Sequence, residues 1–175
     1  MADEIKLASG WSEIDITTQY HQRASQLVNN NYGQIKVAFT PMHGVGQDTF
    51  DACMKEAGFN PSINVAEQTK PDPNFPTVSF PNPEEPGAMD LLLALAKKID
   101  ADVAIANDPD TDRCAVAIPE NGNWKALSGD ELGFLIAWWL IQKSKLTNVS
   151  LKGQMVASIV SSSLVPKMAK ANGLK

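Results

Sequence analysis

Cysteine is scarce in this sequence, which excludes two common ways of stabilising a small protein. Cys53 and Cys114 are the two cysteines among 175 residues, too few for the disulfide framework of a small secreted domain. The two histidines, His21 and His43, do not give them the spacing of a zinc site. We therefore predict a reducing, cytoplasmic location and two thiols that serve as small core residues.

Long apolar runs and basic clusters are also missing. The longest uncharged apolar run, 132–141, is much shorter than the about 18 residues that suggest a membrane span. The acidic start, Met1-Ala2-Asp3-Glu4, has no apolar core and does not resemble a signal sequence. Lys and Arg are dispersed and the formal net charge is −5, which argues against a surface that follows nucleic-acid phosphates. We expect neither membrane nor nucleic acid as a partner.

The hydrophobic content of 43% is enough for a real core, and its pattern alternates strands with helices. We expect strands near 35–39, 63–66, 103–105, 114–118 and 124–127, and helices over 17–30, 50–57 and 87–98. Turns are expected at Asn29–Gly33 and at Asn121-Gly122. This order predicts an α/β fold with three layers, α/β/α, around a mixed, mostly parallel sheet.

Two stretches interrupt the regular pattern. Residues 70–86 are rich in proline, and the embedded Phe75, Val78 and Phe80 predict a packed, rigid loop. Ser128 and Glu131 have the spacing of a capping box, which predicts a buried helix to about Gln142. A strand at 155–160, a turn at 161–163 and a helix at 164–171 then follow without partner strands. We therefore divide the chain into a linker or tail (1–16), a middle domain (17–127) and the beginning of a further, truncated α/β domain (128–175).

Three carboxylates at alternate positions, Asp108, Asp110 and Asp112, follow the strand at 103–105 and are closed by Arg113. An extended segment would send all three to one face, and Pro109 disfavours a helix at the residue before it. Each pair would repel by about 4 kcal/mol at about 4 Å and an effective dielectric near 20. We therefore expect a cation among them, and their hard oxygen ligands favour magnesium, calcium or manganese over zinc.

Two other interpretations of this run are an EF-hand calcium loop and a solvated acidic turn. A calcium loop of the EF-hand type needs glycine at its sixth position and glutamate at its twelfth, where this chain has Arg113 and Pro119. A solvated acidic turn stays open on the motif itself, because Asp and Pro are ordinary turn residues. The position of the run after a buried strand favours a site, since ligands of open α/β sheets bind at the carboxyl ends of strands.

Several segments together resemble the α-D-phosphohexomutase family, in particular phosphoglucomutase/phosphomannomutase members related to phosphopentomutase. They are Thr40–Gly46, Pro71–Thr77, Pro81–Glu85, Asn107–Arg113, and Ser128–Gly133 with Trp138-Trp139-Leu140. The resemblance covers nearly all of the chain from about Tyr20, but a minority of a full mutase. That family has four domains, and this chain resembles the second domain and the start of the third.

The resemblance implies roles for specific residues. Asp108, Asp110 and Asp112 would bind Mg²⁺, and Arg113 would be a catalytic residue close to the reacting phosphate. No serine in the chain matches the family's phosphorylated nucleophile, and Ser161–Ser163 are expected to form a turn. His43 is expected to be a packed turn residue.

The resemblance also implies an activity for the full-length protein. It would interconvert hexose 1-phosphate and 6-phosphate through a phosphoserine enzyme and a bisphosphate intermediate. This piece would supply the magnesium loop, pack against the other domains and be inactive alone. Glucose, mannose and pentose phosphates stay open as substrates, and the alternative is a non-catalytic module that binds a divalent metal or a sugar phosphate.

Overall fold

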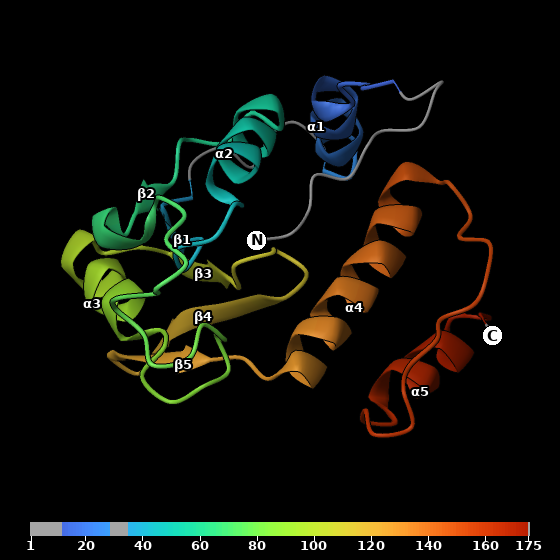
Figure 1. The fold of residues 1–175 in the computed structure, drawn as a ribbon. Coiled ribbons are helices and arrows are strands. Elements are labelled where there is room, and N and C mark those ends of the chain that lie inside the picture. Colours follow the sequence, from blue (N-terminus) through green and yellow to red (C-terminus); the bar gives the residue numbers. More distant parts are fainter. Residues whose placement is uncertain (1–11, 29–34, 175) are drawn as a thin grey trace.

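A mixed five-stranded sheet forms the centre of the fold (Figure 1). The structure is a computed structural model that describes residues 12–28 and 35–174. The strands are β1 (Val37–Thr40), β2 (Ile63–Asn64), β3 (Val103–Asn107), β4 (Cys114–Glu120) and β5 (Asn123–Ala126), in the order β2-β1-β3-β4-β5. β1 pairs in parallel with β2 and β3, whereas β4 is antiparallel to β3 and β5. The predicted mixed sheet is confirmed, and β4 runs antiparallel to both strands beside it.

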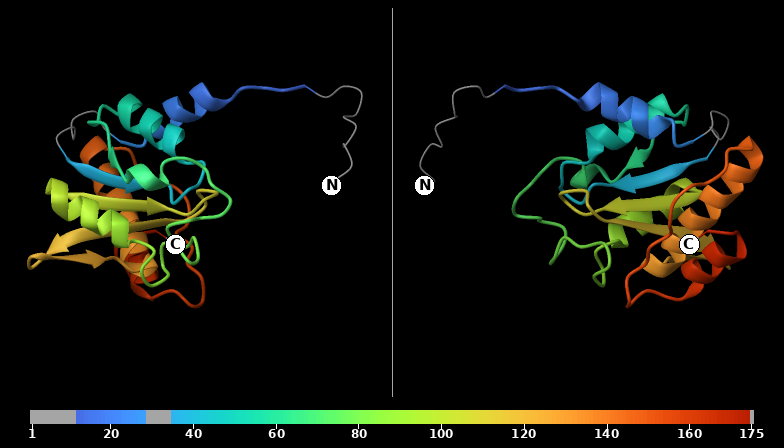
Figure 2. Two further views of the ribbon diagram at one scale, coloured as in Figure 1. Left: turned by 60° about the vertical axis from the view of Figure 1, so that its left-hand side comes forward. Right: turned by 90° about the vertical axis from the view of Figure 1, so that its right-hand side faces the viewer.

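Helices surround this sheet (Figure 2). They are α1 (Thr17–Ser25), α2 (Gln47–Glu56), the 3₁₀ turn η1 (Ala66–Gln68), α3 (Asp90–Ile99), α4 (Gly129–Thr147) and α5 (Leu164–Ala171). Leu92 of α3 is buried in a core with Ala38 and Ala104, whereas Phe50 of α2 stacks on Phe39 with ring centroids 3.8 Å apart. Because adjacent strand residues point to opposite faces, α3 and α2 cover opposite faces. The predicted three-layer α/β fold is therefore confirmed.

α1 packs against α2 and has no buried residue of its own. It ends at Ser25, earlier than predicted. The ammonium group of Lys143 in α4 donates to the carbonyl oxygens of Gln26 and Leu27 at 3.3 and 2.6 Å. These carbonyls follow the last turn of α1, where helical partners are missing. The predicted break at Asn29–Gly33 lies outside the described residues, as do residues 1–11 of the predicted tail.

Two local predictions are confirmed in detail. Ser128 accepts a hydrogen bond from the Glu131 N–H at 3.2 Å, and Glu131 accepts one from the Ser128 N–H at 2.8 Å. This capping box begins α4, which continues to Thr147, beyond the predicted end. Asn121 and Gly122 have φ angles of 50° and 80°, which are the left-handed conformations of a tight hairpin turn.

The proline-rich segment 70–86 contains turns and no helix or strand. Val78 packs against the core and Phe75 is half-buried, as a packed loop requires. Phe80 is 60% exposed. The prediction of a packed loop therefore holds for two of its three apolar side chains.

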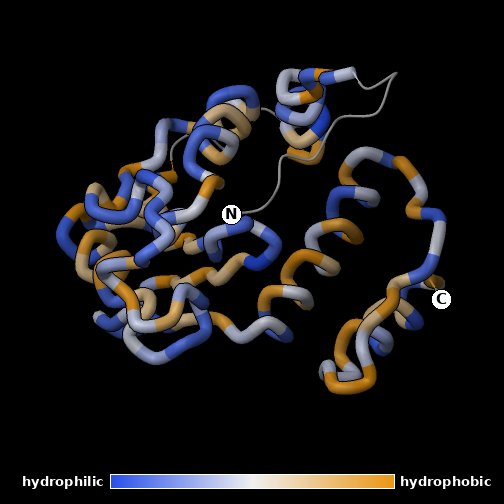
Figure 3. The backbone as a smooth tube through the Cα atoms, in the orientation of Figure 1, coloured by the Kyte–Doolittle hydropathy of each residue, from blue (hydrophilic) through white to orange (hydrophobic). Residues whose placement is uncertain are grey.

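The segment 155–160 does not form the predicted strand. Val156, Ile159 and Val160 are 86%, 102% and 89% exposed. Part of the loop before α5 is coloured as hydrophobic (Figure 3). A strand needs a backbone partner, and none of the described strands lies beside this segment. The predicted helix that follows is present as α5, whereas the hydrogen-bonded turn lies earlier than predicted, with the Ser161 N–H donating to the Ser158 carbonyl at 3.1 Å.

α4 is less buried than predicted. Ala137 and Ile141 are buried, but several large apolar side chains are exposed, namely Leu135, Ile136, Trp138 and Leu140. Packing against α5 covers one side of the helix. Within the described ranges, no helix combines the length and the apolarity that a membrane crossing requires.

Candidate metal centre

The three predicted aspartates converge in one loop between β3 and β4. Oxygen atoms of Asp108, Asp110 and Asp112 lie within 4.8 Å of one another. Asp108 is fully buried, and the other two are exposed. The loop is a turn and not the extended segment that we expected from the alternation. Thr111 adopts a φ of 65°, and its N–H donates to the Asp108 carbonyl at 3.0 Å, so the turn itself brings the carboxylates together.

Arg113 is the cationic partner of the buried carboxylate. Its backbone N–H and its Nε–H donate to the two oxygens of Asp108, each at 2.9 Å. Nε also lies 3.4 Å from Oδ1 of Asp112. Asn107 donates to the Arg113 carbonyl at 2.8 Å and fixes the backbone of the loop's last residue. The Arg113 side chain is 50% exposed, so it can contact a ligand while it holds Asp108.

The pKa values of the loop follow from these contacts. Burial raises the pKa of Asp108, but the hydrogen bonds from the Arg113 backbone and side chain outweigh it and leave that pKa below its ordinary value. The Asp108 side chain, followed by the charge of Asp110, raises the pKa of Asp112. The hydrogen bond to Asp108 raises the pKa of Arg113. The loop therefore contains one strongly compensated carboxylate, Asp108, and a second, Asp112, that shares the charge of Arg113 with Asp108 and is repelled by its acidic neighbours.

The loop rests on the turn that follows β1. Val45 donates its N–H to the Pro109 carbonyl at 2.9 Å. A Cβ at Gly44 would lie 2.2 Å from the Cα of Pro109, and a Cβ at Gly46 would lie 2.6 Å from Oγ1 of Thr111. Gly44 is therefore required by the close approach of two backbones, whereas Gly46 leaves room for the side chain of Thr111. Our sequence reasoning missed this contact, although two glycines after a strand end were an available signal.

The donor set fits a hard divalent cation. Three carboxylates offer only oxygen ligands, which magnesium and calcium prefer. An ionised carboxylate has about four lone-pair positions, so Asp108 can accept the two bonds from Arg113 and still bind a cation. A simple solvated turn does not explain why Asp108 is fully buried.

A hollow of about 530 Å³ lies near the loop, between the end of the proline-rich segment, α3, β4 and the start of α4. Its lining includes Cys114, which directly follows Arg113 and is exposed. The prediction of two core cysteines is therefore wrong for Cys114, while Cys53 is half-buried. The acidic side chains in the lining are Glu84, Glu85, Asp90 and Glu131. Their negative charges disfavour an anion in this hollow.

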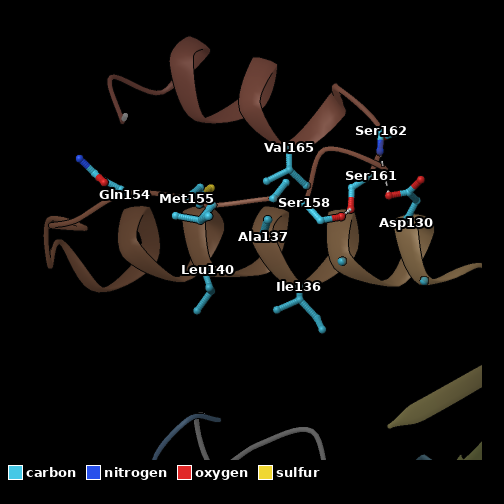
Figure 4. A pocket seen from close by; sticks show the side chains of 14 residues that line it. Asp130, Ile136, Ala137, Leu140, Gln154, Met155, Ser158, Ser161, Ser162 and Val165 are labelled. Carbon is cyan, nitrogen blue, oxygen red and sulfur yellow. Dashed lines mark hydrogen bonds between the residues drawn. The ribbon is translucent and has the colours of Figure 1, made fainter.

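A second hollow, of about 480 Å³, lies between α4 and the segment before α5 (Figure 4). The N–H of Ser162 donates to Asp130 at 3.0 Å, and the hydroxyl oxygens of Ser158 and Ser161 are 2.8 Å apart. Neither His21 nor His43 lines this hollow. Its serines therefore lack a neighbouring histidine, which is the most common general base in proteins.

Comparison with known families gives one domain-level match. Residues 17–122 match the family described as phosphoglucomutase/phosphomannomutase, alpha/beta/alpha domain II. The matched region contains the sheet strands β1 to β4 and the whole aspartate loop.

Curated relatives are similar over most of the chain. It is 39% identical over 157 residues to a probable phosphomannomutase of Haemophilus influenzae, which covers 89% of this chain and 32% of that protein. It is 44% identical over 145 residues to the phosphoribomutase of Saccharomyces cerevisiae, covering 77% of this chain and 23% of that protein. A mouse phosphopentomutase is 40% identical over 148 residues, 83% of this chain and 24% of that protein. The chain thus spans about a third or less of these relatives.

Solved structures share the fold. A putative phosphomannomutase of Thermus thermophilus superposes with a TM-score of 0.70 at 20% identity, over 96% of this chain and 37% of that one. A phosphoglucomutase/phosphomannomutase family protein of Burkholderia thailandensis superposes with a TM-score of 0.63 at 23% identity, over 74% of this chain and 27% of that one.

Proposed function

Because the chain belongs to the phosphoglucomutase/phosphomannomutase family of α-D-phosphohexomutases, we propose that it supplies the metal-binding loop of a phosphosugar mutase. One observation carries the proposal: the Asp108, Asp110 and Asp112 oxygens converge beside Arg113 at the carboxyl end of β3. That edge of an α/β sheet is where ligands bind. The relatives carry the names probable phosphomannomutase, phosphoribomutase and phosphopentomutase, so the sugar stays open.

The three aspartates would bind Mg²⁺ as ligands and would not act as acid or base. When bound, the metal neutralises negative charge on the phosphoryl group during transfer. Asp108 accepts a hydrogen bond from Nε of Arg113. The buried carboxylate thereby orients the half-exposed side chain of Arg113. Arg113 would then contact the reacting phosphate as a catalytic residue.

The complete reaction would interconvert hexose 1-phosphate and 6-phosphate through a phosphoserine enzyme and a bisphosphate intermediate. The serine nucleophile, the acid and base, and the contacts to the sugar would come from other domains of the full-length protein. The exposed apolar side chains of α4, among them Trp138 and Leu140, support packing of 128–175 against such domains as the beginning of a third one. A cytoplasmic location remains a prediction.

Titration calorimetry of this chain with Mg²⁺ tests the metal site. We expect weak binding, because the phosphoserine of the whole enzyme is absent, and a loss of at least tenfold in affinity for Asp110→Ala. Glu56→Gln is the matched control, since Glu56 is an exposed carboxylate at the end of α2 away from the loop. Equal affinities for wild type and Asp110→Ala would exclude the assignment.

An activity assay tests the division of labour between domains. We expect no conversion of glucose 1-phosphate to glucose 6-phosphate by this chain, since it has no matching serine. Measurable turnover would contradict the assignment of 17–127 to a second domain. The alternative of a non-catalytic binding module predicts metal or sugar-phosphate binding but no mutase activity even from the complete reading frame.

A further inference from the structure

A chain of hydrogen bonds links three loops at the edge of the sheet that carries the aspartates. Thr40, the last residue of β1, donates its hydroxyl to Oε1 of Gln68 at 2.6 Å. Nε2 of Gln68 donates to Oγ1 of Thr77 at 2.8 Å. Oγ1 of Thr77 lies 2.8 Å from Nε2 of His43. Thr40, Gln68 and His43 are buried, with 0%, 1% and 4% of their surface exposed, so most of this chain is shielded from water.

The direction of the hydrogen bonds follows from the donors and acceptors that each group has. The Gln68 amide accepts from Thr40 and donates to Thr77, so the Thr77 hydroxyl is left with its proton and one lone pair for His43. Nε2 of His43 makes the remaining hydrogen bond with this hydroxyl, and the tautomer of His43 sets its direction. Hydrogen bonds that run in one direction polarise one another and strengthen the series.

This series of hydrogen bonds stabilises a strained turn. Met42 and His43 both adopt left-handed φ angles, 50° and 60°, which are uncommon for residues other than glycine. The N–H of His43 donates to the Gln68 carbonyl at 3.0 Å, and the His43 carbonyl accepts from the Asp72 N–H at 3.1 Å. Such conformations persist where the surroundings over-determine them. Here η1 and the proline-rich segment do so, through backbone and side-chain bonds to one histidine.

The aspartate loop packs against the same turn. Gly44 follows His43 directly and touches the backbone of Pro109, which lies between Asp108 and Asp110. Gly46 touches the side chain of Thr111, which lies between Asp110 and Asp112. A displacement of the turn would therefore shift both residues that separate the three carboxylates.

We propose that His43 and Thr77 are positioning residues that hold the aspartate loop in its metal-binding geometry through the Met42–Gly46 turn. The proposal rests on the metal site described under the proposed function. The proline-rich segment thereby has a role, because its Thr77 bonds to His43, which lies in the turn that packs against the aspartate loop. Partners of metal ligands outside the coordination sphere change metal affinity by about 10–100-fold, and we expect a loss of this size here.

Mn²⁺ binding measured by electron paramagnetic resonance tests the proposal, with the loss of the free-ion signal as readout. Thr77→Val removes the hydroxyl but keeps the shape, and Thr77 lies at the surface, so no core cavity opens. We expect Thr77→Val to weaken Mn²⁺ binding about tenfold and Thr77→Ser to restore it to within about twofold. His43→Asn tolerates a left-handed φ but cannot reach Thr77, and should also weaken binding, by no more than Thr77→Val, which removes the bond from Gln68 as well.

The double variant and two controls separate the possible results. If both residues act through one hydrogen bond, His43→Asn/Thr77→Val should bind Mn²⁺ no more weakly than Thr77→Val itself. Circular dichroism at the binding temperature should show each variant folded. Binding lost in Asp110→Ala but unchanged in Thr77→Val and His43→Asn would overturn the positioning role and leave the metal site intact. Binding unchanged in Asp110→Ala would overturn the metal site and this proposal with it.

Discussion

Gly44 lies against the backbone of Pro109 so closely that a Cβ at position 44 would be 2.2 Å from the Pro109 Cα. The contact joins the turn after β1 to the loop after β3. Neither backbone can yield easily, since Val45 donates to the Pro109 carbonyl in the same place. The glycine is therefore a condition for the shape of the aspartate loop.

Gly44→Ala should destabilise the fold by about 1–3 kcal/mol, the usual cost of inserting a methyl group where there is no room. Urea denaturation followed by circular dichroism measures this change. Gly133→Ala is the matched control, because Gly133 lies in α4 with no atom near its Cβ position. Alanine there should stabilise by up to about 1 kcal/mol through helix propensity, and equal effects at both positions would contradict the close contact.

Two aspartates of the loop should respond to amidation in opposite ways. Asp108→Asn removes the charge that accepts two bonds from Arg113, and we expect a loss of about 1–3 kcal/mol in stability. Asp108 and Asp110 raise the pKa of Asp112, which indicates that they repel its negative charge. Asp112→Asn removes that charge, so the stability of the metal-free protein at neutral pH should stay equal or increase. Thermal unfolding and Mg²⁺ titration should be measured together.

Both of these variants should nevertheless bind Mg²⁺ less tightly, because each lacks one carboxylate ligand. A lower melting temperature for Asp112→Asn in the absence of metal would contradict the repulsion among the three aspartates. Unchanged stability of Asp108→Asn would contradict the structural role of its pair with Arg113.

The pair of Lys125 and Glu131 should make stability depend on pH. The hydrogen bond from Lys125, 2.8 Å long, and that from the Ser128 N–H lower the pKa of Glu131 to about 2. A lowered carboxyl pKa contributes stability above the unfolded value, about 4.5 here, and that contribution is lost as pH falls towards about 2. Glu131→Gln, which can keep the capping box, should be less stable than wild type at pH 7.

The difference between wild type and Glu131→Gln should shrink as the pH is lowered through this window. Melting temperatures recorded between pH 7 and pH 2 measure it, as a modest effect because the pair is exposed. Glu56→Gln controls for the loss of one negative charge. A difference that stays constant over the whole range would exclude the ion pair as its source.

The exposed segment 155–160 should promote self-association. Val156, Ile159 and Val160 present apolar side chains in a segment with strand-like sequence that pairs with none of the described strands, which favours pairing between molecules. Sedimentation velocity should show association that grows with concentration and decreases in Ile159→Asp. Val45→Asp, at another exposed apolar position, should leave association unchanged, and an equal decrease would point to net charge as the cause.

Sequence reasoning succeeded where short-range chemistry decides the structure. The capping box at Ser128 and the Asn121-Gly122 turn depend on residues within three positions, and both are present. The convergence of the three aspartates was predicted correctly, although for a different local conformation.

The failures concern contacts between distant segments. The fit of Gly44 under Pro109 and the bonds of His43 to Gln68 and Thr77 arise when loops meet at the sheet edge, which spacing along the chain does not reveal. The strand predicted at 155–160 has suitable residues, but a strand also requires a partner.

The hairpin of β4 and β5 determines where the chain leaves the sheet. Because β4 reverses direction and β5 reverses it again, β5 runs towards the edge of the sheet where β3 ends. Ala126 lies level with Ala104, and the N–H of Leu127 donates to the Val116 carbonyl at 2.8 Å. The rigid first turn of α4 begins directly afterwards, at Ser128. If α4 and the residues that follow it rotated as one body, the pivot would therefore lie within two residues of the sheet. A small angular change at Leu127-Ser128 would then move a distant surface towards or away from the aspartates.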